Sequence, residues 1–276
     1  MTTETIPSTR LHTVRLGVRD LDRSTRFYRD LLGFTEVRDG LLSAGPALVE
    51  LTEIGPDGTI GDWVNDDLQG GVRHVGLKVS DVDDRIRRLE AAGVTVLSPP
   101  ADVLGDVRIA FFLDPDGARL EYIQGALNYQ VVHSPEHADA EAADLPGPRD
   151  APRFDHVAVT VDDLTATLRF YCEGLGFELI GQIRHHDDPR GFLMTYLRAG
   201  AAVLEVFSFD VPTGGNPTPA AEAPLVGFRS VSVAAEDLRT AVVRAVAAGG
   251  RLLAERDSSA TLLDPDGVLV TIRSPR

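Results

Sequence analysis

The residues of this chain best suited to chemistry are histidines and glutamates that recur at matching places. Each pair combines a histidine at the start of one predicted strand with a glutamate in the middle of a later strand. The N-terminal half holds two such pairs, His12 with Glu50 and His74 with Glu121. The glutamates lie in otherwise apolar segments, where an unpaired carboxylate would cost several kcal/mol. A bound divalent cation would remove that cost.

These four N-terminal side chains are predicted to form one metal site. A single histidine on a strand is usually structural, and a single strand glutamate usually faces water. Here both recur at equivalent places in two paired repeats, so pseudo-twofold packing can bring them to one point. Two imidazoles and two carboxylates suit Fe(II), Ni, Co, Mn or Zn in a five- or six-coordinate site.

The C-terminal half carries only one such pair, His156 with Glu205. At the places where a second pair would stand, the chain has Ser230 and Thr271. Half a site remains there, so this half of the chain is expected to be metal-free.

The element that positions these residues is a unit written four times along the chain. Its first copy covers residues 11–34, LHTVRLGVRDLDRSTRFYRDLLGF. Alternation of His12, Val14, Leu16 and Val18 on one face predicts a strand. An aspartate then caps a helix that ends at Gly33. Three short predicted strands follow, so each unit is predicted to have the element order βαβββ. Further copies of the unit begin at residues 72, 154 and 228.

The predicted fold class is therefore α+β, with four βαβββ modules paired into two domains. Each domain is expected to be a curled mixed sheet around a concave site. The first domain, 1–126, contains modules 11–54 and 72–125 and the metal site. Residues 127–151 lack periodicity and are predicted to be a linker. The second, degenerate domain, 152–276, contains modules 154–209 and 227–274.

The walls of the predicted pocket follow from strand parity, because residues two apart share a face. Gly76 would leave room beside His74, and Lys78 or Arg119 would hold an anionic group of the substrate. The residues placed on the concave face are Val14, Leu16, Leu48, Gly76, Lys78, Arg119 and Ile123. Of these, Leu16, Leu48, Lys78 and Arg119 are the predicted substrate contacts.

Composition excludes several classes of protein. The net charge of −15 over 276 residues argues against a nucleic-acid partner, which needs a basic face. No apolar run approaches the roughly 20 residues of a membrane helix. The single Cys172 excludes an internal disulfide and a cysteine metal cluster. The N-terminus lacks the segments of a signal peptide, so a cytoplasmic location is expected, as a monomer or a homodimer.

The repeats resemble the vicinal oxygen chelate superfamily, which includes glyoxalases, bleomycin resistance proteins and extradiol dioxygenases. The resemblance covers nearly the whole chain, and the N-terminal half is most similar to bacterial glyoxalase I. The similar segments are 11–34, ALVELT (47–52), RHVGLKV (73–79) and IAFFLDPDGARLEYIQ (109–124). In that family one His and one Glu from each of two modules hold a divalent metal. Those places fall on His12, Glu50, His74 and Glu121.

The chain also departs from the glyoxalase I pattern. That family carries an Arg four residues after its first ligand and an Asn four after its second, both used on glutathione. Here those places hold Leu16 and Ile54. Glutathione hemithioacetal is therefore not the expected substrate. The tandem layout, with one intact and one degenerate domain, is similar to that of the extradiol dioxygenases.

The resemblance implies a glyoxalase-like lyase or isomerase that binds a small substrate through two adjacent oxygens. It would proceed by a metal-stabilised enediolate, with Glu121 or Glu50 as the base that moves the proton. A ring-cleaving dioxygenase using Fe(II) is the alternative, although four protein ligands leave only two of the three metal positions that ring cleavage needs. A non-catalytic antibiotic-binding protein is a second alternative, but it has no need for a complete ligand set.

Overall fold

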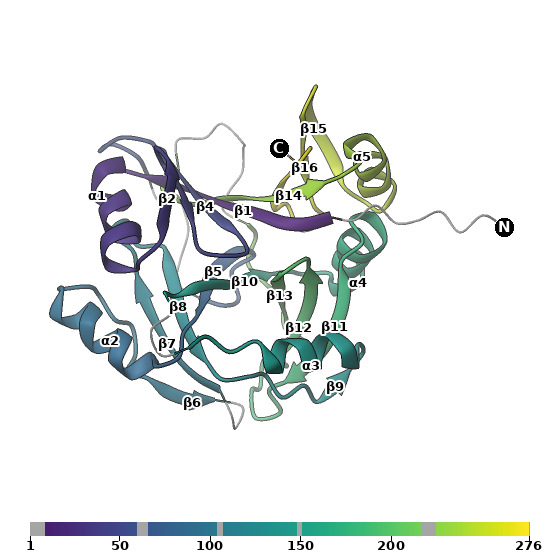
Figure 1. Cartoon of the computed structure of the whole chain (residues 1–276). Helices are drawn as coiled ribbons and strands as arrows, with labels where there is room; N and C mark the ends of the chain where they lie inside the picture. Colours follow the sequence, from purple (N-terminus) through teal and green to yellow (C-terminus); the bar gives the residue numbers. More distant parts are fainter. Residues whose placement is uncertain (1–8, 60–65, 104–106, 148–150, 217–224, 276) are drawn as a thin grey trace.

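Four βαβββ modules build the molecule, as the repeats predict. The computed structural model describes residues 9–59, 66–103, 107–147, 151–216 and 225–275. Within these ranges no helix is both long and apolar enough to cross a membrane. Figure 1 shows the helices of the first two modules on one side of the molecule and those of the last two on the other.

The first half of the chain contains modules one and two. Module one consists of β1 (Thr9–Val18), α1 (Leu21–Arg26), the π-helix η1 (Phe27–Leu31), β2 (Thr35–Arg38), β3 (Leu41–Ser43) and β4 (Leu48–Glu53). Module two consists of β5 (Gly71–Lys78), α2 (Val82–Ala91), β6 (Ala101–Val103), β7 (Val107–Leu113) and β8 (Arg119–Gln124).

The second half repeats this order after a short connecting region. The predicted linker carries structure of its own, β9 (Val131–Val132) and α3 (Pro135–Ala143). Module three consists of β10 (Arg153–Thr160), α4 (Leu164–Leu168), the π-helix η2 (Arg169–Gly174), β11 (Glu178–Arg184), β12 (Leu193–Ala199) and β13 (Ala202–Ser208). Module four consists of β14 (Gly227–Ala235), α5 (Leu238–Ala247), β15 (Arg251–Arg256), β16 (Ser259–Leu263) and β17 (Leu269–Arg273).

An aspartate starts the helix of every module and gives the four repeats a common reference point. These N-cap residues are Asp20, Asp81, Asp163 and Asp237. In each case the carboxylate accepts a hydrogen bond from the backbone N–H three residues later. Such a cap satisfies one of the N–H groups that a helix N-terminus leaves unpaired.

The modules pair into two mixed sheets, but not in chain order. One sheet has eight strands, in the order β15-β16-β17-β14-β1-β4-β3-β2, and joins module one to module four. The other has nine strands, in the order β6-β7-β8-β5-β10-β13-β12-β11-β9, and joins module two to module three. The expectation that successive modules share a sheet is therefore wrong. Each sheet takes one module from each half of the chain.

Successive modules are tied together by helix-to-turn contacts instead. The hydroxyl of Tyr28 in η1 donates to Asp114 in the turn between β7 and β8, at 2.9 Å. Tyr171 in η2 donates in the same way to Asp264 between β16 and β17, also at 2.9 Å. Both aspartates also accept backbone N–H groups of their own Asp-Pro-Asp-Gly turns. Each half of the chain thus holds its two modules together, while the sheets join the halves.

Candidate metal centre

Two histidines and two glutamates converge in the middle of the nine-stranded sheet. They are His74 on β5, Glu121 on β8, His156 on β10 and Glu205 on β13, all buried. The Nε2 atoms of the two histidines lie 3.0 Å apart. Glu121 Oε2 lies 3.0 Å from His156 Nε2 and 3.4 Å from His74 Nε2. Glu205 Oε2 lies 3.4 Å from His156 Nε2 and 3.5 Å from His74 Nε2. Four potential ligand atoms therefore face one point.

The strand register explains this convergence. β10 runs antiparallel to β5, so that His156 stands opposite Gly76 and Ala158 stands opposite His74. Glu121 lies beside Gly76 on one flank, and Glu205 beside Ala158 on the other. A Cβ on Gly76 would overlap the ring of His156. The two smallest side chains at these positions thus leave the space that the imidazoles occupy.

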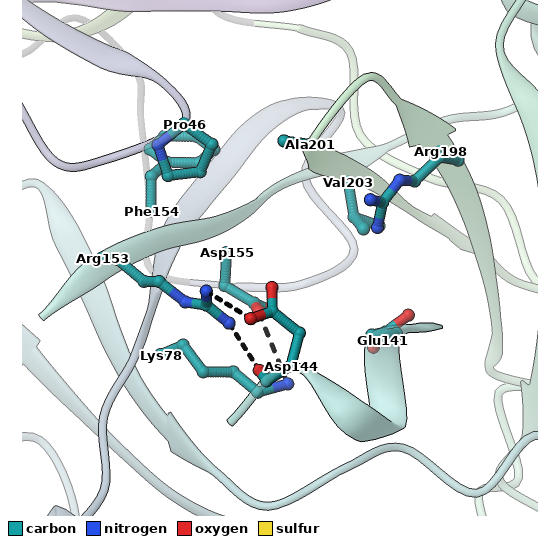
Figure 2. A pocket seen from close by; sticks show the side chains of 10 residues that line it. All are labelled: Pro46, Lys78, Glu141, Asp144, Arg153, Phe154, Asp155, Arg198, Ala201 and Val203. Carbon is teal, nitrogen blue, oxygen red and sulfur yellow. Dashed lines mark hydrogen bonds and ion pairs between the residues drawn. The ribbon is translucent and has the colours of Figure 1, made fainter. Parts of the chain in front are cut away.

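His156 is held by a carboxylate on its outer side. Its Nδ1 lies 2.9 Å from Asp155 Oδ2, and the other oxygen of Asp155 lies 3.5 Å from Lys78 Nζ. This contact keeps the proton on Nδ1 and leaves the lone pair of Nε2 for a cation. Lys78 and Asp155 line a small cavity of about 100 Å³. Figure 2 shows them together with Asp144 and Arg153, which line the same cavity and pair with each other.

His74 has a different outer neighbour. Its Nδ1 lies 3.3 Å from Nη2 of Arg119, which also donates to Asp67 at 2.6 Å. The guanidinium of Arg119 lies over the ring of Phe111, 4.7 Å from its centroid. The two histidines are therefore positioned by groups of opposite charge.

Burial and neighbouring charges separate the two glutamates. Burial raises the pKa of Glu205 well above its ordinary value, against the nearby charge of His156. Burial also opposes ionisation of Glu121, but hydrogen bonds with His156 and His74 outweigh it and hold its pKa low. The pKa of His156 is raised, because the charge of Glu205 and bonds to Asp155 and Glu121 overcome burial. The surroundings of the two carboxylates thus push their pKa values in opposite directions, Glu121 down and Glu205 up.

These donors fit a divalent transition metal. Imidazole nitrogens and carboxylate oxygens are its usual ligands, and the negative charges would neutralise a dication in a buried place. The donor atoms of His74, His156 and Glu205 lie within 4.8 Å of one another. Glu121 adds a fourth at hydrogen-bond distance from His156.

The cavity in front of the four residues, the metal-site pocket, has a volume of about 160 Å³. Its polar members besides the four are Asp67, Arg119, His185 and Tyr196. Most of its wall is apolar, formed by Val103, Ile109, Phe111, Ile123, Leu127, Phe192, Met194 and Phe207. Modules two and three, the two modules of this sheet, both supply wall residues.

The structure does not bring the predicted four ligands together. His74 and Glu121 lie in this site, but His12 and Glu50 lie on β1 and β4 of the eight-stranded sheet. The ring of His12 contacts the hydroxyl of Thr13, at 2.6 Å. Glu50 accepts two hydrogen bonds from Arg15, at 3.0 and 3.2 Å. The pair that the sequence analysis sets aside as half a site, His156 and Glu205, completes the group instead.

Two features account for this error: modules one and two lie in different sheets, and the alignment of the repeats is shifted by one residue at His12. Counted back from the capping aspartates, His74 and His156 both lie seven residues before their caps, whereas His12 lies eight before Asp20. His12 is the extra residue of a β-bulge between Leu11 and Thr13. Since side chains alternate between faces, a shift of one residue assigns the wrong face. The cap spacing is the signal in the sequence that identifies Thr13 as the true counterpart.

The predicted substrate contacts are also divided between sheets. Leu16 is buried in the core and Leu48 lies on β4, both in the eight-stranded sheet. Lys78 is buried behind His156 and lines the cavity of Figure 2 rather than the metal-site pocket. Arg119 alone lines the metal-site pocket. Gly76 makes room for a histidine as expected, but for His156 rather than His74.

Both halves of the chain match the same protein family. The Glyoxalase/Bleomycin resistance protein/Dioxygenase superfamily matches residues 10–122 and 153–272. Together these segments cover most of the chain.

Several curated proteins are similar in sequence. A probable lactoylglutathione lyase of Synechocystis sp. is 32% identical over 131 residues, covering 41% of this chain and 93% of that protein. A lactoylglutathione lyase of Arabidopsis thaliana is 28% identical over 193 residues, covering 64% of this chain and 58% of that protein. A metapyrocatechase of Pseudomonas sp. is 32% identical over 184 residues, with coverage of 64% and 58%.

Solved structures share the fold of the whole chain. Glyoxalase I from Zea mays superposes with a TM-score of 0.71 at 23% identity, covering 97% of this chain and 92% of that one. A putative dioxygenase from Bacillus subtilis has a TM-score of 0.61 at 14% identity, covering 98% and 86%. With the family match over both halves, these likenesses lead to one conclusion. The chain is a two-domain member of the glyoxalase/bleomycin resistance protein/dioxygenase superfamily.

Proposed function

We propose that this chain is a divalent-metal-dependent enzyme of glyoxalase type, a lyase or isomerase for a small substrate with two adjacent oxygens. The observation that carries the proposal is the buried group of two imidazoles and two carboxylates from four neighbouring strands. Nickel, cobalt, zinc, manganese and ferrous iron all suit this donor set. When bound, such a cation supplies Lewis-acid polarisation of a carbonyl oxygen.

Glu205 is the proposed proton carrier. It lines the metal-site pocket, and burial favours its protonated form, so it would accept a proton from the carbon next to a carbonyl and return that proton to the neighbouring carbon. Glu121 contacts both histidines and is expected to remain ionised as a ligand. The earlier candidate Glu50 lies in the other sheet, bonded to Arg15, and is not part of this proposal.

The wall of the pocket favours a small, largely apolar substrate. Glutathione brings two carboxylates, but the described wall offers one guanidinium, Arg119, which already pairs with Asp67. Counting four residues on from His156 and from Glu205 gives Thr160 and Phe209, neither an arginine nor an asparagine. The lactoylglutathione lyases among the relatives support the reaction type, while the pocket supports a substrate without a glutathionyl group.

Ring cleavage is the second candidate, because a metapyrocatechase is among the relatives. Extradiol cleavage needs three open metal positions, and four protein ligands in an octahedron leave two. The same pocket would serve both reactions if Glu205 were displaced from the metal. The two candidates differ in whether oxygen is consumed.

Proton transfer can be tested directly with the metal-loaded protein. An aromatic or branched α-hydroxy ketone or ketoaldehyde adduct would be incubated in D₂O and followed by NMR. Deuterium incorporation beside the carbonyl, lost in Glu205→Gln, is the expected result. Oxygen uptake with catechol and Fe(II), without any deuterium exchange, would instead establish the dioxygenase.

A further inference from the structure

The chain contains one lysine, Lys78 on β5, and this lysine is buried. Only 1% of its side chain is exposed. Its ammonium nitrogen donates no hydrogen bond to any residue that the structure describes. Taking an ammonium group out of water costs several kcal/mol unless opposite charge compensates it. A lysine in such a place is therefore expected to serve a specific partner.

The first strand of a module does not require a cation at this position. Lys78 lies three residues before Asp81, the aspartate that caps the helix of its module. The residues three before the other capping aspartates are small and uncharged: Gly17, Thr160 and Ala234. The strand therefore forms in three modules without a lysine, so the reason for Lys78 lies in the groups that surround it.

The partner of Lys78 is Asp155, which also contacts His156. Nζ of Lys78 lies 3.5 Å from Asp155 Oδ1, and Figure 2 shows the side chain reaching toward that carboxylate. The other oxygen, Oδ2, lies 2.9 Å from Nδ1 of His156. Phe154 and His156 both pair with β5, so Asp155 between them is the extra residue of a β-bulge on β10. Neighbouring residues on a regular strand point to opposite faces, and the bulge lets Asp155 contact the ring beside it.

Two other cations line the same small cavity, but neither takes the place of Lys78. Arg153 donates to Asp144 instead, both to its carboxylate and to its backbone carbonyl. Arg198 forms no ion pair with Asp155 within the part of the chain that the structure describes. Lys78 therefore supplies the positive charge on the outer side of Asp155. The cavity of about 100 Å³ leaves room for water around its N–H groups.

We infer that Lys78 is a positioning residue of the metal centre and acts through Asp155. Its charge holds one oxygen of the carboxylate, and the other oxygen holds the imidazole of His156 with Nε2 directed at the metal. Charges then alternate from the ammonium to the carboxylate and, across the imidazole, to the bound cation. Lys78 is not among the described residues that line the metal-site pocket, so it affects metal binding rather than contact with the substrate. The inference rests on the proposed function, since it takes His156 as a metal ligand.

Competition between the full chain and a chromophoric chelator for zinc measures this effect without any substrate. Lys78→Met removes the charge but keeps the length of the side chain, and it should weaken zinc affinity by about 10-fold or more, as the loss of an outer partner does. Lys78→Arg keeps the charge and should recover most of that affinity, which a role in filling space alone does not predict. Arg153→Gln is the matched control and should bind zinc as the original chain does, because Arg153 lines the same cavity but pairs with Asp144.

A double variant shows whether Lys78 acts through Asp155. Lys78→Met combined with Asp155→Asn should bind zinc as Asp155→Asn alone does, because the two changes break one connection. Losses that add fully, or the original affinity in Lys78→Met, overturn the inference while the metal site stands. An original chain that binds none of the proposed divalent metals overturns the proposed function as well. If Lys78→Met does not fold, the double variant is still compared with Asp155→Asn, since it leaves neither charge of the pair behind.

Discussion

The two sheets of this protein are built from the same module, yet they gather opposite kinds of charge. In the nine-stranded sheet, small residues at Gly76 and Ala158 leave space for two imidazoles and two carboxylates. In the eight-stranded sheet, Arg15 occupies the equivalent position and binds Glu50, the counterpart of Glu205. The two sheets therefore differ at this position and at the ligand positions, where Thr13, Ser230 and Thr271 replace two histidines and a glutamate. The duplicated fold retains a cavity in each sheet and lines the two cavities with different side chains.

The largest expected difference between the sheets concerns their glutamates. Glu205→Gln should lower the turnover of the metal-loaded enzyme by roughly 10²- to 10⁴-fold, the usual contribution of a general acid–base. Glu50→Gln, the equivalent change in the other sheet, should leave turnover unchanged. Steady-state rates on the same substrate compare the two. A loss of activity in Glu50→Gln with Glu205→Gln active would reverse the assignment of the sheets.

A smaller effect is expected at Asp155, which contacts the outer nitrogen of His156. Asp155→Asn should weaken metal affinity by about 10- to 100-fold, as the loss of such an outer partner typically does. Competition with a chromophoric chelator measures this without any substrate. Asp144→Asn is the control, because Asp144 lines the same cavity but pairs with Arg153 (Figure 2). Equal metal affinities in the two variants would show that Asp155 does not contribute to metal binding through His156.

The sequence predicts the repeat and its elements well, because their signals are local. Strand alternation and capping aspartates identify all four βαβββ modules, and the recurring histidines and glutamates indicate a metal site. The pairing of modules is not local, since β1 joins β14 across most of the chain. Nothing in the modules themselves says which two share a sheet. The number of residues between His12 and Asp20 indicates the register of His12. The alternation of side chains between the faces of a strand does not reveal the β-bulge there.

A further expected effect, on stability rather than on turnover or metal affinity, concerns the two Asp-Pro-Asp-Gly turns. Burial raises the pKa of Asp114 to about 6 and that of Asp264 to about 7. A carboxyl with a raised pKa in the folded state favours folding when protonated. Its contribution is complete below about pH 4 and is lost as the pH rises through the folded value, by at most about 1.4 kcal/mol per pH unit.

Asn substitution should therefore flatten the dependence of unfolding free energy on pH between about 4 and 7. Denaturant unfolding at several pH values measures it. Asp264→Asn should flatten the curve up to a higher pH than Asp114→Asn, because its folded-state pKa is higher. Identical pH profiles for the original chain and both variants would show that neither turn holds a perturbed carboxyl.

The central claim is that one metal ion binds where modules two and three meet. Elemental analysis of anaerobically purified protein tests it most directly, with His156→Gln compared to His12→Gln. We expect one divalent metal per chain in the original protein and in His12→Gln, and none in His156→Gln. Metal retained by His156→Gln and lost from His12→Gln would contradict the account.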